Sequence, residues 1–137
     1  SRLNLNIREK FGLTYSIESN YSSYSDIGLF SVYFNGEKKS TDRIIKLIQK
    51  EFRSFRDKKM GVNQLHQAKQ QLKGHIALAQ ENRVGLMLAL GKSLLYFGPV
   101  ETNKEIFSKI DEITSDEILS IANEILVDNN MTTLIYE

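Results

Sequence analysis

The chain has 137 residues and a formal net charge of +1, with 18 basic and 17 acidic side chains, 41% apolar residues and no cysteine. This composition is ordinary for a globular protein that buries a core. It excludes disulfides, thiolate zinc sites and cysteine nucleophiles, and its charge balance gives no reason to expect a nucleic acid or an anionic membrane as partner.

The first residues predict a helix end followed by a β-hairpin. Leu3, Ile7 and Phe11 recur every four residues, which is typical of an amphipathic helix, and Gly12 suits its C-terminus. Apolar and polar residues then alternate in "LTYSIESNY", which predicts a strand with Tyr15 on its apolar face. A polar turn and the aromatic run "GLFSVYF" complete a predicted antiparallel hairpin over 13–35.

The chain from 40 to 127 is predicted to be mainly helical. The first helix has N-cap candidates (Ser40, Thr41, Asp42) and an apolar stripe (Ile44, Ile45, Ile48, Phe52, Phe55). The second repeats apolar residues at helical spacing (Leu65, Ala68, Leu72, Ile76, Ala79). A third, over about 83–96, is apolar on nearly all sides, so we expect it to be buried. Thr114 and Glu117 form a capping-box pattern, and "MTTLIY" predicts a last strand over 131–136.

These elements predict an α+β fold with helices packed on one face of a mainly antiparallel sheet. A hairpin and one distant strand make a thin sheet for so much helix. We therefore expect further strands upstream of Ser1, and we expect residues 1–137 to form a single partial domain.

Catalytic patterns are absent from the sequence. His66 and His75 are the only histidines, and nine positions on one predicted helix place them on opposite faces. Neither stands in H-E-x-x-H or H-x-x-E-H. His66 is expected to be exposed, and His75 is expected at the edge of the core. No G-x-S-x-G or glycine-rich phosphate loop is present, so the sequence predicts no metal site and no nucleophile in this chain.

Two sets of residues have both a structural and a functional interpretation. The hairpin aromatics (Tyr21, Tyr24, Phe30, Tyr33, Phe34) can form one core face with a partly exposed turn, or a platform for a peptide. Arg8 and Tyr15, on either side of Gly12, can be a solvated arginine and a core tyrosine. Alternatively, both donate hydrogen bonds to one carbonyl oxygen of a bound peptide. Spacing alone leaves both interpretations open.

A family resemblance covers essentially the whole chain. The segments that carry it are "SRLNLNIREKFGLTYSIESNYSSYSDIGLFSVYF", "QLHQAKQQLKGHIAL", "LGKSLLYFG" and "IDEITSDEILSIANEIL". Their order and spacing resemble the second-domain segment of the pitrilysin/insulinase family of zinc metallopeptidases, the inverzincins, which includes mitochondrial processing peptidase and bacterial two-domain proteases.

The resemblance implies one half of a clamshell that closes around an unfolded peptide. In this family one half holds zinc through H-x-x-E-H and a distant glutamate, and the other contributes an arginine and a tyrosine spaced as Arg8 and Tyr15 are here. By that likeness these two are the expected substrate-binding residues, with no metal ligand or catalytic group in this chain. The zinc and the base glutamate are expected in a companion half-domain or subunit.

The expected function is therefore the substrate-binding, non-metal half of a zinc endopeptidase, a C-terminal half-domain that is inactive by itself. The alternative is a noncatalytic peptide-binding or scaffolding subunit of the same family. Expected partners are the zinc-bearing half and a peptide substrate. Self-association through exposed sheet edges is a further hypothesis, because a fragment lacks its neighbouring strands. We expect a soluble protein of the bacterial cytoplasm or periplasm, with no membrane span.

Overall fold

The chain forms two compact units, which we describe separately. The computed structural model describes residues 2–136, apart from the side chain of Phe97. Unit 1 comprises Ser1–Lys59 and Leu119–Glu137, and unit 2 comprises Met60–Ile118. Two compact units can belong to one domain, so the single partial domain that the sequence predicts stays a prediction.

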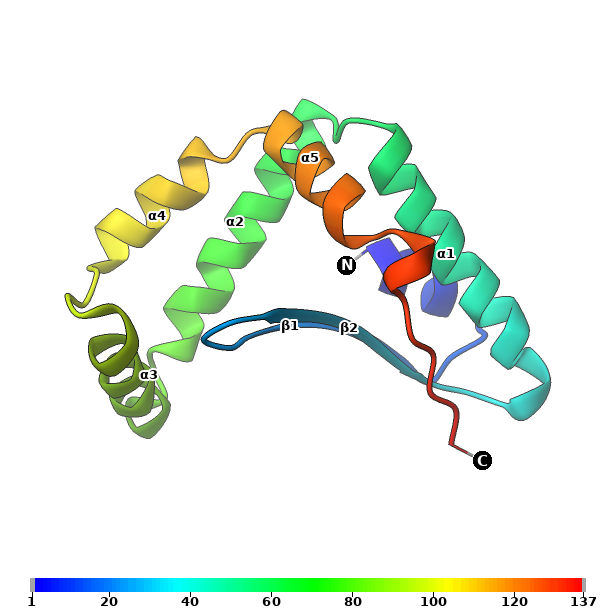
Figure 1. Ribbon diagram of the computed structural model, residues 1–137, viewed down its shortest axis with the longest axis horizontal. Coiled ribbons are helices and arrows are strands. Elements are labelled where there is room, and N and C mark those ends of the chain that lie inside the picture. Colours follow the sequence, from blue (N-terminus) through cyan, green and yellow to red (C-terminus); the bar gives the residue numbers. More distant parts are fainter. Residues whose placement is uncertain (1, 137) are drawn as a thin grey trace. The chain divides into compact units, whose positions relative to one another are not determined.

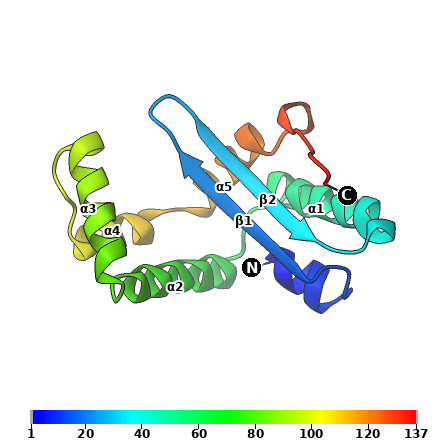
Figure 2. The same cartoon turned by 90° about the horizontal axis from the view of Figure 1, so that it is seen from below.

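Unit 1 contains the predicted hairpin (Figures 1 and 2). Strands β1 (Ser16–Ser23) and β2 (Gly28–Asn35) pair antiparallel, with Ile17 opposite Phe34 and Tyr21 opposite Phe30. The predicted hairpin over 13–35 is present, although its ladder begins only at Ser16. The ring of Tyr21 lies across Gly28, where a Cβ would come within 2.3 Å of the phenol oxygen. Glycine at this position therefore lets the ring cover the neighbouring strand.

Helices cover one face of this hairpin and enclose the core of unit 1. They are the π-helical segment η1 (Asn4–Glu9), helix α1 (Thr41–Asp57) and the last turns of α5 (Ser115–Ile125). The buried apolar cluster joins these elements to β1: Leu3, Ile7, Ile17, Ile44, Ile48, Phe52, Ala122 and Leu126. Its spacing along α1 follows the predicted stripe, because one face of a helix repeats every three to four residues.

The hairpin and α1 also meet through an aromatic pair. The rings of Phe30 and Phe52 pack edge to face, with 6.0 Å between their centres. Side chains on this face of the strands, such as Val32 and Phe34, are half-buried against the core cluster. The predicted α+β class, with helices packed on an antiparallel sheet, is confirmed.

Unit 2 is built from α2 (Val62–Ala79), α3 (Arg83–Phe97), α4 (Asn103–Glu112) and the first turn of α5. Polar contacts hold α2 against α4. The Lys73 amine pairs with the Asp111 carboxylate at 2.6 Å, and the Lys69 amine donates to the Asp111 backbone carbonyl at 2.7 Å. At the other end, the side-chain amides of Gln80 and Asn103 exchange hydrogen bonds.

The expected burial of the third helix is wrong. Most apolar side chains of α3 are more than half exposed: Val84, Met87, Leu88, Leu94, Leu95 and Tyr96. A helix that is apolar on all sides needs cover on more than one side. The described elements of unit 2 cover little of the surface of α3. His75, expected at the edge of the core, is likewise exposed, because α2 buries none of its residues.

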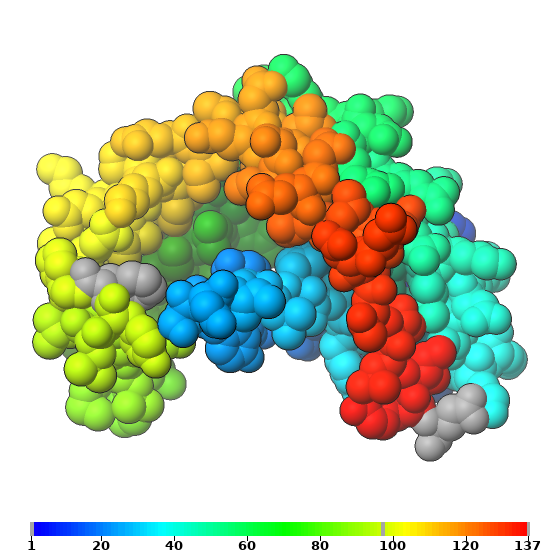
Figure 3. Space-filling view, viewed as in Figure 1, coloured from blue at the N-terminus to red at the C-terminus, as the bar shows by residue number. Residues whose placement is uncertain are grey.

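The predicted strand over 131–136 does not form. A strand requires a ladder partner, and within residues 2–136 the one sheet consists of β1 and β2. Met131 has extended dihedral angles, yet Leu134, Ile135 and Tyr136 are all exposed. Figure 3 shows this segment (red) on the surface of unit 1. Residues 131–136 therefore have the composition of a strand, but they do not pair with another strand of the described structure.

Candidate functional site

Arg8 lies in the last turn of η1, whose hydrogen bonds span one residue more than those of an α-helix. The Lys10 amide donates to the Leu5 carbonyl at 3.0 Å, five residues back. Buried Leu3 and Ile7 anchor the segment to the core, and Arg8 faces solvent. Short π-helical segments are frequent at functional sites, because the extra residue shifts the side chains around the helix axis.

The chain leaves η1 through a turn at Gly12, as the sequence predicts. Gly12 has φ +61°, a left-handed conformation that disfavours residues with a Cβ. Its amide donates to the Arg8 carbonyl at 2.9 Å, and the Leu13 amide reaches the Ile7 carbonyl at 3.4 Å. These bonds fix the backbone of Arg8 relative to the start of the hairpin.

Tyr15 stands just before β1 and is held by its backbone. Its amide donates to the Asn35 carbonyl at 3.0 Å, and the Asn35 side chain accepts from the Ser16 amide at 2.8 Å. The expected place of Tyr15 on the buried face of the strand is wrong: the residue is 70% exposed, while Ile17 is buried. Tyr15 lies beyond the part of the hairpin that the core covers, so the core-tyrosine interpretation fails.

Tyr15 lines a groove of about 300 Å³ between the end of the η1 turn and the segment after β2. Its walls are Gly12, Leu13, Thr14, Tyr15, Glu37, Lys39 and Ser40, so Arg8 is not part of the lining. Glu37 and Lys39 form an ion pair of 2.7 Å at the surface. The hydrogen bond and charge of Glu37, with a smaller contribution from Tyr15, raise the pKa of Lys39 above its ordinary value.

Thr14 is the buried polar residue of this region. It is 7% exposed, and its hydroxyl has no hydrogen-bond partner in the described structure. The hydroxyl oxygen has almost no accessible surface, so a ligand in the groove does not reach it in this arrangement. Thr14, Glu37 and Lys39 were not predicted from the sequence. The mixed charge of "NGEKKS", interpreted only as a turn, was the available signal.

Arg8 and Tyr15 are therefore two exposed donors at the two ends of one turn. Neither side chain has a hydrogen bond to another part of the described chain, so five guanidinium N–H groups and one phenol are available to a ligand. A guanidinium and a phenol can each donate hydrogen bonds to a carbonyl oxygen and stabilise negative charge on it. The turn thus exposes two side chains that can donate hydrogen bonds.

Metal chemistry finds no support in the described residues. Across residues 2–136, no group of three or more His, Asp or Glu side chains is arranged to hold a metal ion. His66 is exposed, as the sequence predicts, and His75 is exposed on the same helix. No helix in this range is both long enough and apolar enough to cross a bilayer.

The described residues form an α+β fold, and comparisons with known proteins identify the family. Residues 1–72 match the family described as "Peptidase M16 inactive domain". An uncharacterized zinc protease of Rickettsia felis is 33% identical over 125 residues, which is 91% of this chain and 30% of that protein. The beta subunit of the mitochondrial-processing peptidase of Saccharomyces cerevisiae is 27% identical over 74% of this chain and 22% of that protein.

The chain belongs to the peptidase M16 family, in which it corresponds to the inactive domain. The crystal structure of a peptidase M16 inactive domain from Pseudomonas fluorescens has the same fold, with a TM-score of 0.73 over 90% of this chain and 29% of that one, at 23% identity. The family expected from the sequence is thus confirmed. This chain spans a third or less of the length of these relatives.

Proposed function

We propose that this chain is the substrate-binding, non-metal half of a zinc-dependent endopeptidase that hydrolyses peptides or unfolded proteins. Arg8 and Tyr15 bind the substrate near the scissile bond. Zinc and the general base belong to a companion half-domain or subunit, where the metal polarises the scissile carbonyl and activates water. The role of this chain is to hold the peptide from across the cleft.

The observation that carries the proposal is the pair of unpaired donors at the η1 turn. The Gly12 turn fixes the backbone of Arg8, and the hydrogen bonds to Asn35 fix the backbone at Tyr15. Both side chains remain exposed. Tyr15 is 70% exposed, so a ligand can reach its side chain. The names of the relatives, zinc proteases and a processing-peptidase subunit, agree with a peptide as ligand.

A noncatalytic peptide-binding or scaffolding subunit is the second candidate. Residues 2–136 contain no metal-binding cluster, which agrees with both candidates. The enzyme would hold its zinc in another domain or subunit, and the scaffold would need no metal. The two differ in one property of the complete protein. The enzyme requires an H-x-x-E-H motif with a downstream glutamate in the same polypeptide or in a partner subunit, and the scaffold does not.

The test replaces Arg8 by Ala and Tyr15 by Phe in the complete protein that contains this chain. Each change is expected to lower kcat/KM for a quenched fluorescent peptide by about 10²–10³, the usual cost of one donor to a developing oxyanion. Zinc content and thermal stability should stay unchanged, because both side chains are exposed and unpaired.

Two matched controls come from the same unit. Arg53→Ala removes an exposed arginine from α1, and Tyr136→Phe removes the hydroxyl of an exposed tyrosine from the last segment of unit 1. Both controls should retain full activity. Unchanged kinetics in Arg8→Ala and Tyr15→Phe, or equal losses in the controls, would refute the assignment.

A further inference from the structure

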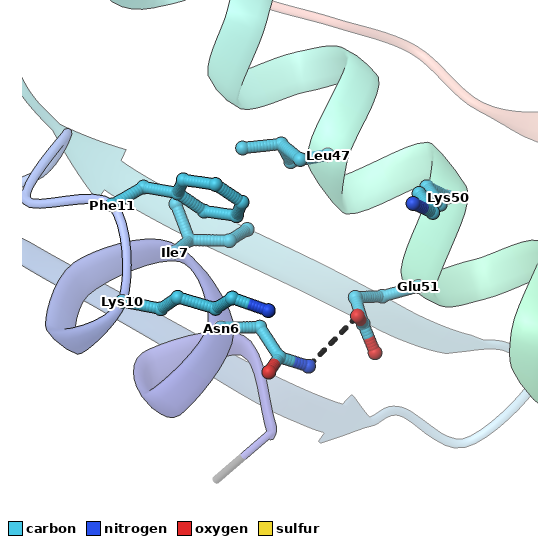
Figure 4. Close-up of a pocket in the computed structure, with 7 residues that line it drawn as sticks. All are labelled: Asn6, Ile7, Lys10, Phe11, Leu47, Lys50 and Glu51. Carbon is cyan, nitrogen blue, oxygen red and sulfur yellow. Dashed lines mark hydrogen bonds between the residues drawn. The ribbon is translucent and has the colours of Figure 1, made fainter.

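A second cavity, of about 190 Å³, lies on another side of η1, between η1 and α1 within unit 1. Figure 4 shows its lining residues: Asn6, Ile7, Lys10, Phe11, Leu47, Lys50 and Glu51. Neither Arg8 nor Tyr15 belongs to this lining. The cavity is therefore separate from the groove beside Tyr15, although both border the same turn.

The size of the cavity limits what it can hold. Pockets for complete small ligands usually have volumes of about 300–1,000 Å³. A space of 190 Å³ is smaller than that range and suits a single amino-acid side chain. Part of a longer chain, rather than a free metabolite, is therefore the ligand that fits.

The lining combines an apolar side with positive charge. Ile7, Phe11 and Leu47 face one another at one side of the cavity (Figure 4). Lys10 and Lys50 approach it from η1 and α1, and neither has an ion pair with a carboxylate of residues 2–136. The Lys10 amine lies 5.7 Å from the centre of the Phe11 ring. Such a site takes the methylene groups and the charged end of an acidic side chain.

Glu51 is the acidic residue of the lining, and its charge is already compensated. One oxygen accepts from the Asn6 amide at 2.8 Å, as the dashed line in Figure 4 marks. The other lies 2.8 Å from the Arg2 guanidinium in an ion pair that lacks hydrogen-bond geometry, and the same guanidinium donates to the Ser54 hydroxyl. The two lysines therefore remain as uncompensated positive charges.

Arg43 adds to the positive field on the same flank. Its guanidinium lies 5.6 Å from the centre of the Phe11 ring, which already carries Lys10 as a neighbour. Cations over an aromatic face are held in place by the ring quadrupole. Two positive groups thus lie close to the ring of Phe11, which lines the cavity.

We propose that this cavity is a subsite for an Asp or Glu side chain of the bound peptide, with Lys10 and Lys50 as the residues that determine the preference. The inference rests on the proposed function for its ligand, a peptide. The methylene groups of the acidic side chain contact the apolar wall, and its carboxylate accepts hydrogen bonds from the two amines.

The experiment measures binding by the chain itself and does not need catalysis. End-blocked alanine peptides with one central Glu, and matched peptides with Gln, are titrated into the isotopically labelled chain and followed by NMR. The Glu peptide is expected to bind roughly fivefold more tightly, which is the effect of about 1 kcal/mol from exposed charge pairs. Shifted amides should include those of Asn6, Phe11 and Leu47.

Four charge-removing variants locate the effect. Lys10→Gln and Lys50→Gln should each reduce the preference for Glu, and the double variant should abolish it. Lys46→Gln removes the same charge from an exposed position of α1 outside the lining, so it should leave the preference unchanged. Circular dichroism checks that the variants remain folded, and Lys10→Arg should keep the preference.

Equal binding of the two peptides would overturn the subsite, as would a preference that Lys46→Gln reduces as much as Lys10→Gln does. Shifts confined to residues outside the lining would do the same. None of these results bears on Arg8 or Tyr15, whose role is tested by kinetics in the complete protein. Failure of the subsite and failure of the proposed function are thus distinguishable.

Discussion

The two units differ in what holds their helices. In unit 1, α1 has no side-chain hydrogen bond at its N-cap residue, Ser40, and the predicted cap at this position is wrong. The helix is held instead by a buried stripe in which Ile44 has no exposed surface. Burying such a side chain contributes about 1.5–3 kcal/mol, more than a cap usually does.

In unit 2, side-chain caps are present at the starts of α3, α4 and α5, and few apolar side chains are buried. The Thr102 hydroxyl and the Glu105 carboxylate form a capping box at the start of α4, and Thr114 and Glu117 form another at the start of α5. The Asn82 side chain caps α3 by accepting from the Gly85 amide at 3.0 Å. Most apolar side chains of α3 stay exposed. Local hydrogen bonds thus define helix ends in a unit where burial contributes little.

The largest expected effect separates the two units directly. Ile44→Ala should lower the free energy of unfolding of unit 1 by about 2–5 kcal/mol, because it leaves a cavity in a closed core. Leu88→Ala, at a position that is 64% exposed in α3, should change the free energy by less than about 0.5 kcal/mol. Urea unfolding, with hydrogen exchange to assign the loss to each unit, measures both. Equal losses would contradict the comparison.

A smaller effect is expected at the caps. Thr102→Ala should destabilise α4 by about 1 kcal/mol, because the Glu105 amide loses its acceptor. Ser40→Ala, at the N-cap of α1, should change stability by less than about 0.5 kcal/mol, since no side-chain cap bond exists there. Hydrogen exchange of the first-turn amides provides the measurement. A larger loss for Ser40→Ala would mean that α1 also depends on its cap.

The smallest effect is an acid dependence of helices α4 and α5. The backbone amide and then the hydroxyl of Thr102 lower the pKa of Glu105 below its ordinary value of 4.5, and Thr114 does the same for Glu117. A lowered pKa in the folded state stabilises the helices above pH 4.5, and this contribution is lost as the pH falls through the folded values.

The measurement compares the wild type with Glu105→Gln/Glu117→Gln by far-UV circular dichroism and amide exchange between pH 6 and pH 3. The wild type should lose helix stability in α4 and α5 more steeply than the double variant does. Parallel curves for the two proteins would argue against a role of these carboxylates in the acid response.

Local features of the fold were predictable from the sequence. The end of η1, the Gly12 turn, the hairpin and the Thr114 cap each depend on interactions between residues close in the chain. The capping box of Thr102 and Glu105 at the start of α4 follows the same pattern and was missed, although both residues were visible in the sequence. Such features are set by backbone conformation and by hydrogen bonds over a few positions.

The candidate site was predictable only in part. The sequence and its family resemblance pointed to Arg8 and Tyr15, whose role remains a proposal. The exposure of Tyr15 was not predictable, because alternation assigns it to the same face as Ile17. The cavity with Lys10 and Lys50 was not foreseen either, since it joins residues about forty positions apart.

By itself, the sequence determined which segments become helices, where the hairpin and two turns fall, and which family the chain belongs to. Only the tertiary structure decided which apolar faces are covered. Ile44 is buried while Leu88 and Leu134 are not, and 131–136 remains unpaired. The physical reason is that burial and strand pairing require a partner surface, which local sequence patterns do not contain.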